Sequence, residues 1–175
     1  MVLTENELIR WPPMCPPPPD SMQGVTFLMS KLGFHVSQRF GEAVAPLGLI
    51  PPHVGILRLV GEEPGQSQQA LARKIGIPPN RLVALIDELE ARELIRRERP
   101  PTDRRVFALH LTPAGEEMAE KVREIGIEHE RRITAALDDD ERRQLAGLLR
   151  KVAEEQGLPA GFHPGLRKLG SWSAR

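Results

Sequence analysis

The chain has 175 residues, with 24 Lys or Arg, 24 Asp or Glu and no formal net charge. This length suits one compact domain with extensions, or one domain with added dimerisation helices. A single cysteine excludes an internal disulfide and a cysteine-based metal cluster. Apolar stretches are interrupted well short of about 20 residues, so we expect no transmembrane helix. The N-terminus also lacks the basic start and apolar core of a secretory signal, which favours a cytoplasmic protein.

Residues 1–22 form a proline-rich extension that contains the run Trp11–Pro19. Clustered prolines favour polyproline II. Such a segment can serve as a ligand for another domain, but we favour a dimer arm or a loose tail. A redox-sensing thiol needs a nearby cation or helix start. Cys15 has only Arg10 close to it in sequence, so we interpret it as an ordinary tail thiol.

Two amphipathic helices are expected after this extension. The first covers about 24–45 and ends at Pro46; we interpret the segment 23–48 as a dimerisation helix. The second, shorter helix follows Pro51. Apolar residues recur every three or four positions in both helices: Val25, Leu28, Leu32, Val36, Phe40, Ala43 and Leu47 in the first, and Val54, Leu57 and Val60 in the second.

The middle of the chain predicts two short helices separated by a turn. Leu71 and Ile75 lie four apart on one face of the first helix. Gly76 can take the positive φ that ends it, and Pro78 and Pro79 suit the start of the next helix. This order is typical of a helix-turn-helix, whose second helix reads base edges with its N-terminal residues. That second helix has an apolar face (Leu82, Leu85, Ile86, Leu89) and an outer face (Asn80, Arg81, Val83, Ala84, Asp87, Glu88, Arg92).

A hairpin with an arginine-rich tip follows. Leu94–Glu98 predicts one strand, and the tip Arg99–Arg105 is polar and turn-forming. Arginine on a protruding loop can enter the minor groove or bind a phosphate. Thr112 before Pro113 predicts the N-cap of a new helix, which completes a winged helix-turn-helix. In the partner strand, Val106, Ala108 and His110 alternate with Phe107, Leu109 and Leu111, which indicates one buried face.

Two more amphipathic helices are expected between residues 112 and 156. The first begins near Pro113, and Asp138 begins the second as its N-cap. A winged domain of this size cannot cover their apolar faces, so we expect a homodimer in which the first and last helices interleave about a two-fold axis. The apolar residues are Met118, Val122, Ile125, Ile133 and Leu137 in one helix, and Leu145, Leu148, Leu149 and Val152, expected to face inward, in the other.

The tail, residues 157–175, combines glycine and proline with many apolar side chains. A disordered tail seldom carries so many, so we expect it to pack on the dimer helices. The apolar residues are Leu158, Phe162, Leu166, Leu169 and Trp172.

The stretch from Leu71 to Gly115 resembles the MarR family of bacterial winged-helix transcriptional regulators. The similarity rests on LA-x-x-IGI, LIDELEAR, LIRR, the wing triplet Asp103-Arg104-Arg105 and the run Leu111-Thr112-Pro113-Ala114-Gly115. The resemblance implies a mostly α fold with a small antiparallel β wing, in which a winged helix-turn-helix domain (50–111) lies between N- and C-terminal dimerisation helices. It also implies a sequence-specific DNA-binding regulator: a homodimeric repressor of a pseudo-palindromic operator that a small-molecule effector releases.

Two departures from the family pattern bear on DNA recognition. Glu93 stands where the family usually has glycine, and since a left-handed conformation costs a non-glycine residue energy, we expect this helix to end differently. Val83 and Ala84 stand where the family often has a hydroxyl and a basic residue. Because Val83 and Ala84 are apolar, the face expected to enter the groove lacks these two hydrogen-bonding groups.

The DNA contacts we predict lie at the start of the second helix and in the wing. Asparagine can read adenine and arginine can read guanine, although Asn80 and Arg81 could also be ordinary solvated residues. Arg105 is the residue we expect to meet DNA, with Asp103 orienting an arginine; the alternative is an exposed charged turn. The full predicted set is Gln68, Pro79, Asn80, Arg81, Ala84, Arg97, Asp103, Arg104 and Arg105.

An effector pocket is a further implication, because the family often holds aromatic acids between the dimer helices and the winged domain. His35 and Arg39, with His53 and Arg58, could line such a pocket and meet a carboxylate, or could be ordinary polar residues. The five histidines follow no metal-ligand spacing, so we expect no metal or other cofactor.

The charge is sorted along the chain. Gln66 to His110 contains nine Lys or Arg and six Asp or Glu, whereas Thr112 to Gln156 contains eight and twelve. Such a small basic surplus predicts moderate affinity for DNA that gains from dimerisation. It also leaves open a winged module that binds protein instead of DNA. Because no nucleophile elbow, phosphate loop or pair of catalytic carboxylates occurs, we do not expect an enzyme.

Overall fold

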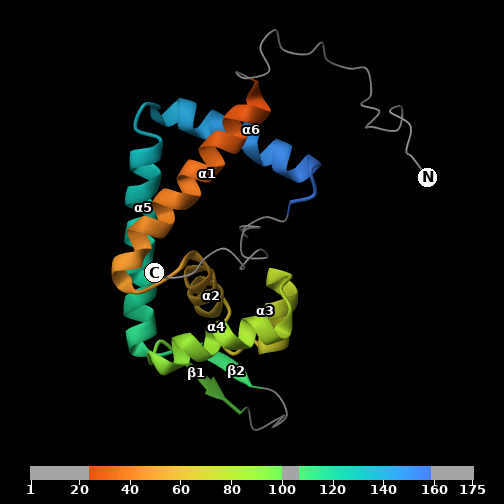
Figure 1. Cartoon of the computed structure of the whole chain (residues 1–175), viewed down its shortest axis with the longest axis vertical. Helices are drawn as coiled ribbons and strands as arrows, with labels where there is room; N and C mark the ends of the chain where they lie inside the picture. The colour runs from red at the N-terminus through yellow and green to blue at the C-terminus, as the bar shows by residue number, and fades with distance from the viewer. Residues whose placement is uncertain (1–23, 100–106, 159–175) are drawn as a thin grey trace, which may run out of the picture. The chain divides into compact units, whose positions relative to one another are not determined.

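The computed structural model describes residues 24–99 and 107–158 (Figure 1). The chain divides into two units, residues 1–37 and 38–175, and the boundary falls within the first helix. The predictions for the proline-rich extension with Cys15, for the wing tip and for the tail beyond Leu158 lie outside the described residues. The elements are α1 (Val25–Val44), the 3₁₀ turn η2 (Ala45–Leu47), α2 (Pro51–Glu62), α3 (Gln68–Ile75), α4 (Pro79–Ala91), β1 (Ile95–Glu98), β2 (Ala108–Leu111), α5 (Pro113–Ile133) and α6 (Asp139–Glu155).

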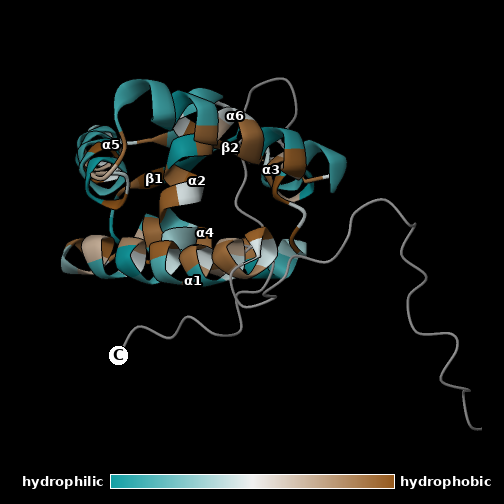
Figure 2. Cartoon of the chain, turned by 90° about the horizontal axis from the view of Figure 1, so that it is seen from above, coloured by the Kyte–Doolittle hydropathy of each residue, from teal (hydrophilic) through white to brown (hydrophobic). Residues whose placement is uncertain are grey.

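The helices are amphipathic, as Figure 2 shows by the mixture of hydrophobic and hydrophilic residues along each ribbon. In the described residues no single helix is long and apolar enough to span a membrane; only α1 and α2 taken together as a bent pair meet that criterion, by length and composition alone.

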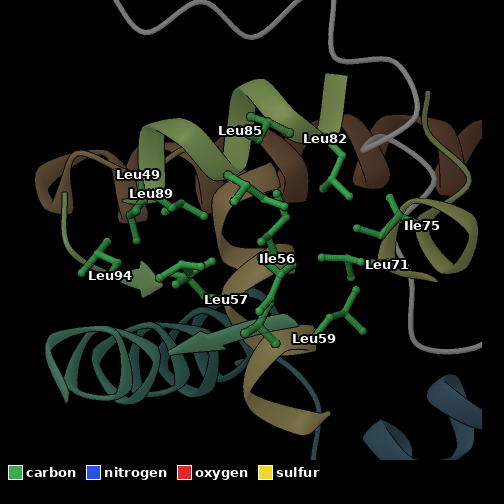
Figure 3. Close-up of a cluster of buried hydrophobic side chains, with 14 of the residues drawn as sticks. Leu49, Ile56, Leu57, Leu59, Leu71, Ile75, Leu82, Leu85, Leu89 and Leu94 are labelled. Carbon is green, nitrogen blue, oxygen red and sulfur yellow. The ribbon is translucent and has the colours of Figure 1, made fainter. Parts of the chain in front are cut away.

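The core of the second unit lies where α2, α3 and α4 meet. Two caps hold the short α3 in place: Ser67 Oγ accepts from the amide of Ala70 at 3.1 Å, and Gly76, as predicted, ends the helix with φ 72°. Figure 3 shows side chains from the three helices pointing toward one another. Each fully buried Leu or Ile contributes about 1.5–3 kcal/mol. The most buried members are Val44, Ile56, Leu57, Val60, Leu71, Ile75, Leu82, Ile86, Leu89, Ile95 and Leu109.

The wing sheet is an antiparallel pair in which Ile95 lies opposite Leu111 and Glu98 opposite Ala108. The strict alternation predicted for the second strand is wrong, because neighbouring Ala108 and Leu109 are both buried. The segment before α3 explains the difference. Gln66 O accepts from the Leu109 amide at 3.0 Å, and Ser67 forms an isolated bridge with Ala108, so this segment covers the other edge of β2.

The end of α4 corrects a second prediction. Glu93 does adopt the left-handed conformation, with φ 54°. The Glu93 amide donates to Glu90 O at 2.8 Å and the Leu94 amide donates to Leu89 O at 3.0 Å, which is the Schellman pattern of a helix that normally ends in glycine. The helix therefore ends as in the family pattern, and these bonds offset the steric cost of roughly 1–2 kcal/mol.

The start of α5 is joined to the end of α4. Thr112 caps α5, since its Oγ1 accepts from the Gly115 amide at 3.0 Å, and the same hydroxyl donates to Glu93 O. The Thr112 amide donates to Leu94 O at 3.2 Å. A Cβ on Gly115 would lie 1.9 Å from Leu94 O, so only glycine allows the first turn of α5 to approach this closely. Within the Leu-Thr-Pro-Ala-Gly run, the threonine is thus needed to cap α5 and the glycine is needed for close packing against Leu94.

The last helix, α6, is well capped but poorly covered. Asp138 accepts from the Glu141 amide at 2.9 Å, and Glu141 accepts from the Asp138 amide at 3.0 Å, which is a capping box. No residue of α6 is buried. The apolar face that we expect a second chain to cover is exposed in the single chain. The exposed fractions are 41% for Leu145, 65% for Leu148, 42% for Leu149 and 41% for Val152.

Candidate nucleic-acid interface and ligand cavity

The N-terminal half of α4 presents the surface predicted to read DNA. Pro79 is the first helical residue, and Pro79, Asn80 and Ala84 are exposed while Arg81 is half-buried. Asn80 Oδ1 accepts from the Arg81 amide at 3.0 Å. A helix start also offers backbone amides and a positive dipole end to a phosphate. The structure thus brings Pro79, Asn80, Arg81 and Ala84 together on one accessible helix end.

The C-terminal half of α4 is used differently. Glu88 Oε2 lies 3.0 Å from Nε2 of His53 on α2. Arg92 donates to Gly48 O at 2.7 Å and to Leu47 O at 2.8 Å, the carbonyls of the turn that precedes α2. Sequence reasoning placed Glu88 and Arg92 on the outer face, but the structure uses them to dock α4 on its neighbours.

Arg97 on β1 has a different role from the one predicted. Its side chain is only 15% exposed and forms ion pairs with Asp87 and Glu90 of α4. With its amide oxygen turned toward Arg97, Gln68 accepts from Nε at 2.9 Å and from Nη2 at 3.0 Å. We therefore correct the role of Arg97: it ties the starts of β1 and α3 to α4, and Gln68 belongs to the same network.

We expect Arg97→Ala to lower the free energy of unfolding by about 1–3 kcal/mol, because two carboxylates lose a half-buried charged donor. Arg96→Ala is the matched control, since Arg96 is exposed and, within the part of the chain that the structure describes, pairs only with the exposed Glu98; its effect should stay within about 0.5 kcal/mol. Urea denaturation measures both. Equal effects of the two substitutions would contradict the network.

The base of the wing is described, whereas its tip is not. The Arg99 guanidinium lies 5.0 Å from the centre of the Phe107 ring, in a cation–π contact between the two ends of the loop. Asp103, Arg104 and Arg105 lie outside the described residues, so their contacts with DNA stay predictions.

A cavity of about 710 Å³ lies between α2 and α5. Its wall holds two arginines, each with a carboxylate: Arg58 donates to Glu62 at 2.8 Å, and Arg123 Nε donates to Glu120 at 2.8 Å. The hydrogen bond from Arg123 lowers the pKa of the Glu120 carboxyl. The lining residues are Phe40, Val54, Leu57, Arg58, Gly61, Glu62, Leu111, Glu116, Ala119, Glu120, Val122, Arg123 and Gly126.

Of the four residues predicted to bind an effector, Arg58 alone lines this cavity. His53 is buried, with its Nε2 3.0 Å from Glu88 Oε2 on α4, and Arg39 is exposed and pairs with Glu42 at 3.1 Å. His35 belongs to the first unit, where it is exposed on α1. Sequence reasoning missed Arg123, although small residues at Gly61, Ala119 and Gly126 were a signal that side chains leave room here.

A metal site is not found in the described ranges, where no three His, Cys, Asp or Glu side chains are arranged to hold an ion.

Comparisons with known proteins decide the family. The MarR family pattern matches residues 47–106. A candidate transcriptional regulatory protein for the hcr operon of Thauera aromatica is 31% identical over 133 residues, which cover 71% of this chain and 80% of that protein. The chain belongs to the MarR family. The transcriptional repressor CouR, solved with a 23-mer DNA duplex, is 31% identical with a TM-score of 0.68, over 76% of this chain and 94% of that one.

Other MarR family structures agree with the fold. A crystal structure of MarR has 25% identity and a TM-score of 0.67, over 87% of this chain and 98% of that one. A MarR family protein of Mycobacterium tuberculosis in complex with salicylic acid has 24% identity and a TM-score of 0.60, over 74% and 96%. The predicted mostly helical fold with a two-stranded antiparallel wing is therefore confirmed.

Proposed function

We propose that this MarR family regulator is a homodimeric repressor that binds a pseudo-palindromic operator and leaves it when a small acid occupies the cavity. The observation that carries the proposal is the division of α4. Its C-terminal half is docked through Glu88 and Arg92, while its N-terminal half is left accessible, as a reading helix requires. The repressor CouR, a relative with the same fold, has been solved on a DNA duplex.

Base contacts in this proposal come from Asn80 and Arg81, and backbone contacts come from the wing through Arg105. Pro79 and Ala84 offer only apolar surface at the same helix end. Few polar readers and a small basic surplus imply that two copies are needed for useful affinity. The winged domain over 50–111 then lies between dimerisation segments at 23–48 and 112–156.

The effector in this proposal is a small aromatic acid. The cavity has an apolar wall, formed in part by Phe40, Val54 and Leu57, beside the guanidinium groups of Arg58 and Arg123. A planar guanidinium binds a carboxylate through two parallel hydrogen bonds. A ligand carboxylate would therefore compete with Glu62 or Glu120 for the arginine partner, while its ring covers apolar surface.

A second candidate function is a winged module that binds another protein. Exposed Val83 and Ala84 on α4 favour it, as does the absence of net charge. Binding that weakens steeply with salt separates the two functions, because release of counterions from DNA phosphates has that signature.

The test is a gel shift with the DNA upstream of the protein's own gene, over a series of salt concentrations. Arg105→Ala should weaken binding to every sequence and flatten the salt dependence, because it removes a phosphate contact. Arg81→Ala should mainly relax sequence preference, by about 1–3 kcal/mol at one base pair. Lys121→Ala, an exposed charge on α5, serves as the control for lost charge alone.

Three outcomes would count against parts of the proposal. Binding by Arg105→Ala equal to that of the wild type contradicts the role of the wing. No salt-dependent binding by the wild type favours the protein-binding module. Sodium salicylate is the first effector probe; if a series of aromatic acids leaves wild-type binding unchanged, the effector part is wrong.

A further inference from the structure

The cavity between α2 and α5 has two main walls, and each is one face of a helix, since residues three, four and seven apart share a face. The lining residues are Val54, Leu57, Arg58, Gly61 and Glu62 on α2, and Glu116, Ala119, Glu120, Val122, Arg123 and Gly126 on α5. These walls hold two arginines and three glutamates, so carboxylates outnumber guanidinium groups by one. An acid that enters adds another negative charge. Its binding is therefore favoured where a carboxylate of the wall gives up its arginine and turns into water.

The space beside the two arginines is unequal. Arg123 has small residues one turn away on both sides, Ala119 and Gly126, and a Cβ built at Gly126 meets nothing within 4 Å. Beside the arginine of α2, a Cβ at Gly61 would lie 3.2 Å from Leu111 Cδ1, so that turn of the helix is already covered. The ring of an aromatic acid therefore has room next to Arg123, which makes Arg123 the cation placed to meet its carboxylate.

Glu120 already pairs with Arg123 in the way that a bound acid would. Arg123 Nε donates to Glu120 Oε2 at 2.8 Å, and Nη2 donates to Oε1, so both carboxylate oxygens face one edge of the guanidinium. Arginine recognises carboxylates by this planar pairing through two bonds. The hydrogen bond from Arg123 lowers the pKa of the Glu120 carboxyl, which keeps Glu120 anionic at neutral pH. A ligand carboxylate that pairs with this edge must therefore take the place of Glu120.

Displacement of Glu120 costs little, because its pair with Arg123 is exposed. The side chains of Glu120 and Arg123 are 54% and 61% exposed, and the two residues lie three apart on α5. An exposed pair of this kind changes an equilibrium constant by at most about 5-fold. The released carboxylate can rotate into water without disturbing the helix. An effector can thus overcome this competitor, at the cost of a higher acid concentration.

We propose that Glu120 is an internal competitor of the effector: it occupies the edge of Arg123 that a ligand carboxylate needs, and so sets the acid concentration at which the regulator leaves DNA. This inference rests on the proposed function and deepens it, because it names the anchoring arginine and the residue that tunes the response. Removal of the Glu120 carboxylate raises the affinity for acids. Substitution of a residue that only lined the cavity would lower that affinity or leave it unchanged.

The test measures the dissociation constant of sodium salicylate by isothermal titration calorimetry, with salicylamide as the uncharged analogue. We expect Glu120→Gln to bind salicylate about 3- to 5-fold more tightly than the wild type, and Arg123→Gln to bind it about 10-fold or more weakly. Salicylamide has no carboxylate, so its affinity should not change in Glu120→Gln. Glu117→Gln is the matched control, because Glu117 is exposed on the same helix and does not line the cavity; it should bind both compounds as the wild type does.

The same shift should appear in the release of DNA, with salicylate freeing half of the upstream duplex from Glu120→Gln at about 3- to 5-fold lower concentration. Because the expected result is a gain of affinity, a poorly folded variant cannot imitate it. Salicylate binding by Glu120→Gln that equals or falls below that of the wild type, or an equal gain in Glu117→Gln, would overturn the inference while the proposed function stands. If the wild type binds neither salicylate nor any other aromatic acid, the effector part of the proposed function is wrong and this inference fails with it.

Discussion

Gly115→Ala should lower the free energy of unfolding by roughly 3 kcal/mol or more, a large share of the stability of a domain this size. The added Cβ would lie 1.9 Å from Leu94 O and 2.9 Å from the Leu94 carbonyl carbon. Both are backbone atoms, so no side chain can rotate away to make room. Relief requires that α5 move off the end of α4, which breaks the bonds of Thr112 to Glu93 and Leu94. Urea denaturation followed by circular dichroism gives the change.

Gly126→Ala is the matched control on the same helix. A Cβ at Gly126 meets nothing within 4 Å, and replacing glycine by alanine inside a helix stabilises it by about 0.5–1 kcal/mol. The two substitutions add the same methyl group to the same helix and should change stability in opposite directions. A Gly115→Ala protein as stable as Gly126→Ala would show that the junction between α4 and α5 is not tightly packed.

Much of the fold was predictable because its signals are local. Leu71 and Ile75, four residues apart, do face the core, and Gly76 does end the helix with a positive φ. Thr112 and Asp138 cap helices as predicted. Each of these signals lies within four residues: the spacing of Leu71 and Ile75, the Gly76 amide that donates to Ala72 O, and the two caps that accept amides three residues on.

The roles of charged residues in the candidate site were not predictable in the same way. Arg97 meets Glu90 and Asp87, seven and ten residues away, and Arg92 meets carbonyls 44 and 45 residues away. A basic residue on the predicted outer face of a DNA-binding helix or strand is equally compatible with a phosphate contact. Only the tertiary arrangement shows that the arginine guanidinium already donates to a carboxylate or a backbone carbonyl of the same chain.

These internal contacts change the charge that α4 presents. Two of its acidic residues, Asp87 and Glu90, form ion pairs with Arg97. Without that cation, the two carboxylates would repel phosphates near Arg81. Holding them toward β1 lets an acidic helix approach DNA with its N-terminal end, where the helix dipole is positive.

Leu148→Glu should convert the protein from dimer to monomer and weaken binding to the upstream DNA by about 100-fold or more. Leu148 is 65% exposed in the single chain, within an apolar face that also contains Leu145, Leu149 and Val152. A stable 17-residue helix with no buried residue leaves this face in water unless another chain covers it. A carboxylate buried there without a partner costs several kcal/mol, and loss of the dimer removes the gain from two linked contacts with DNA.

Arg150→Gln tests whether the change in net charge matters by itself, since it also lowers the charge by one and Arg150 is exposed on the side of α6 opposite the apolar face. It should remain dimeric in sedimentation and bind DNA as the wild type does. The wild-type melting temperature should rise with protein concentration, because dimerisation stabilises the folded chain by mass action; that dependence should disappear in Leu148→Glu. If Leu148→Glu sediments as a dimer with unchanged affinity, α6 is not part of the interface, and the winged domains must be paired through another surface.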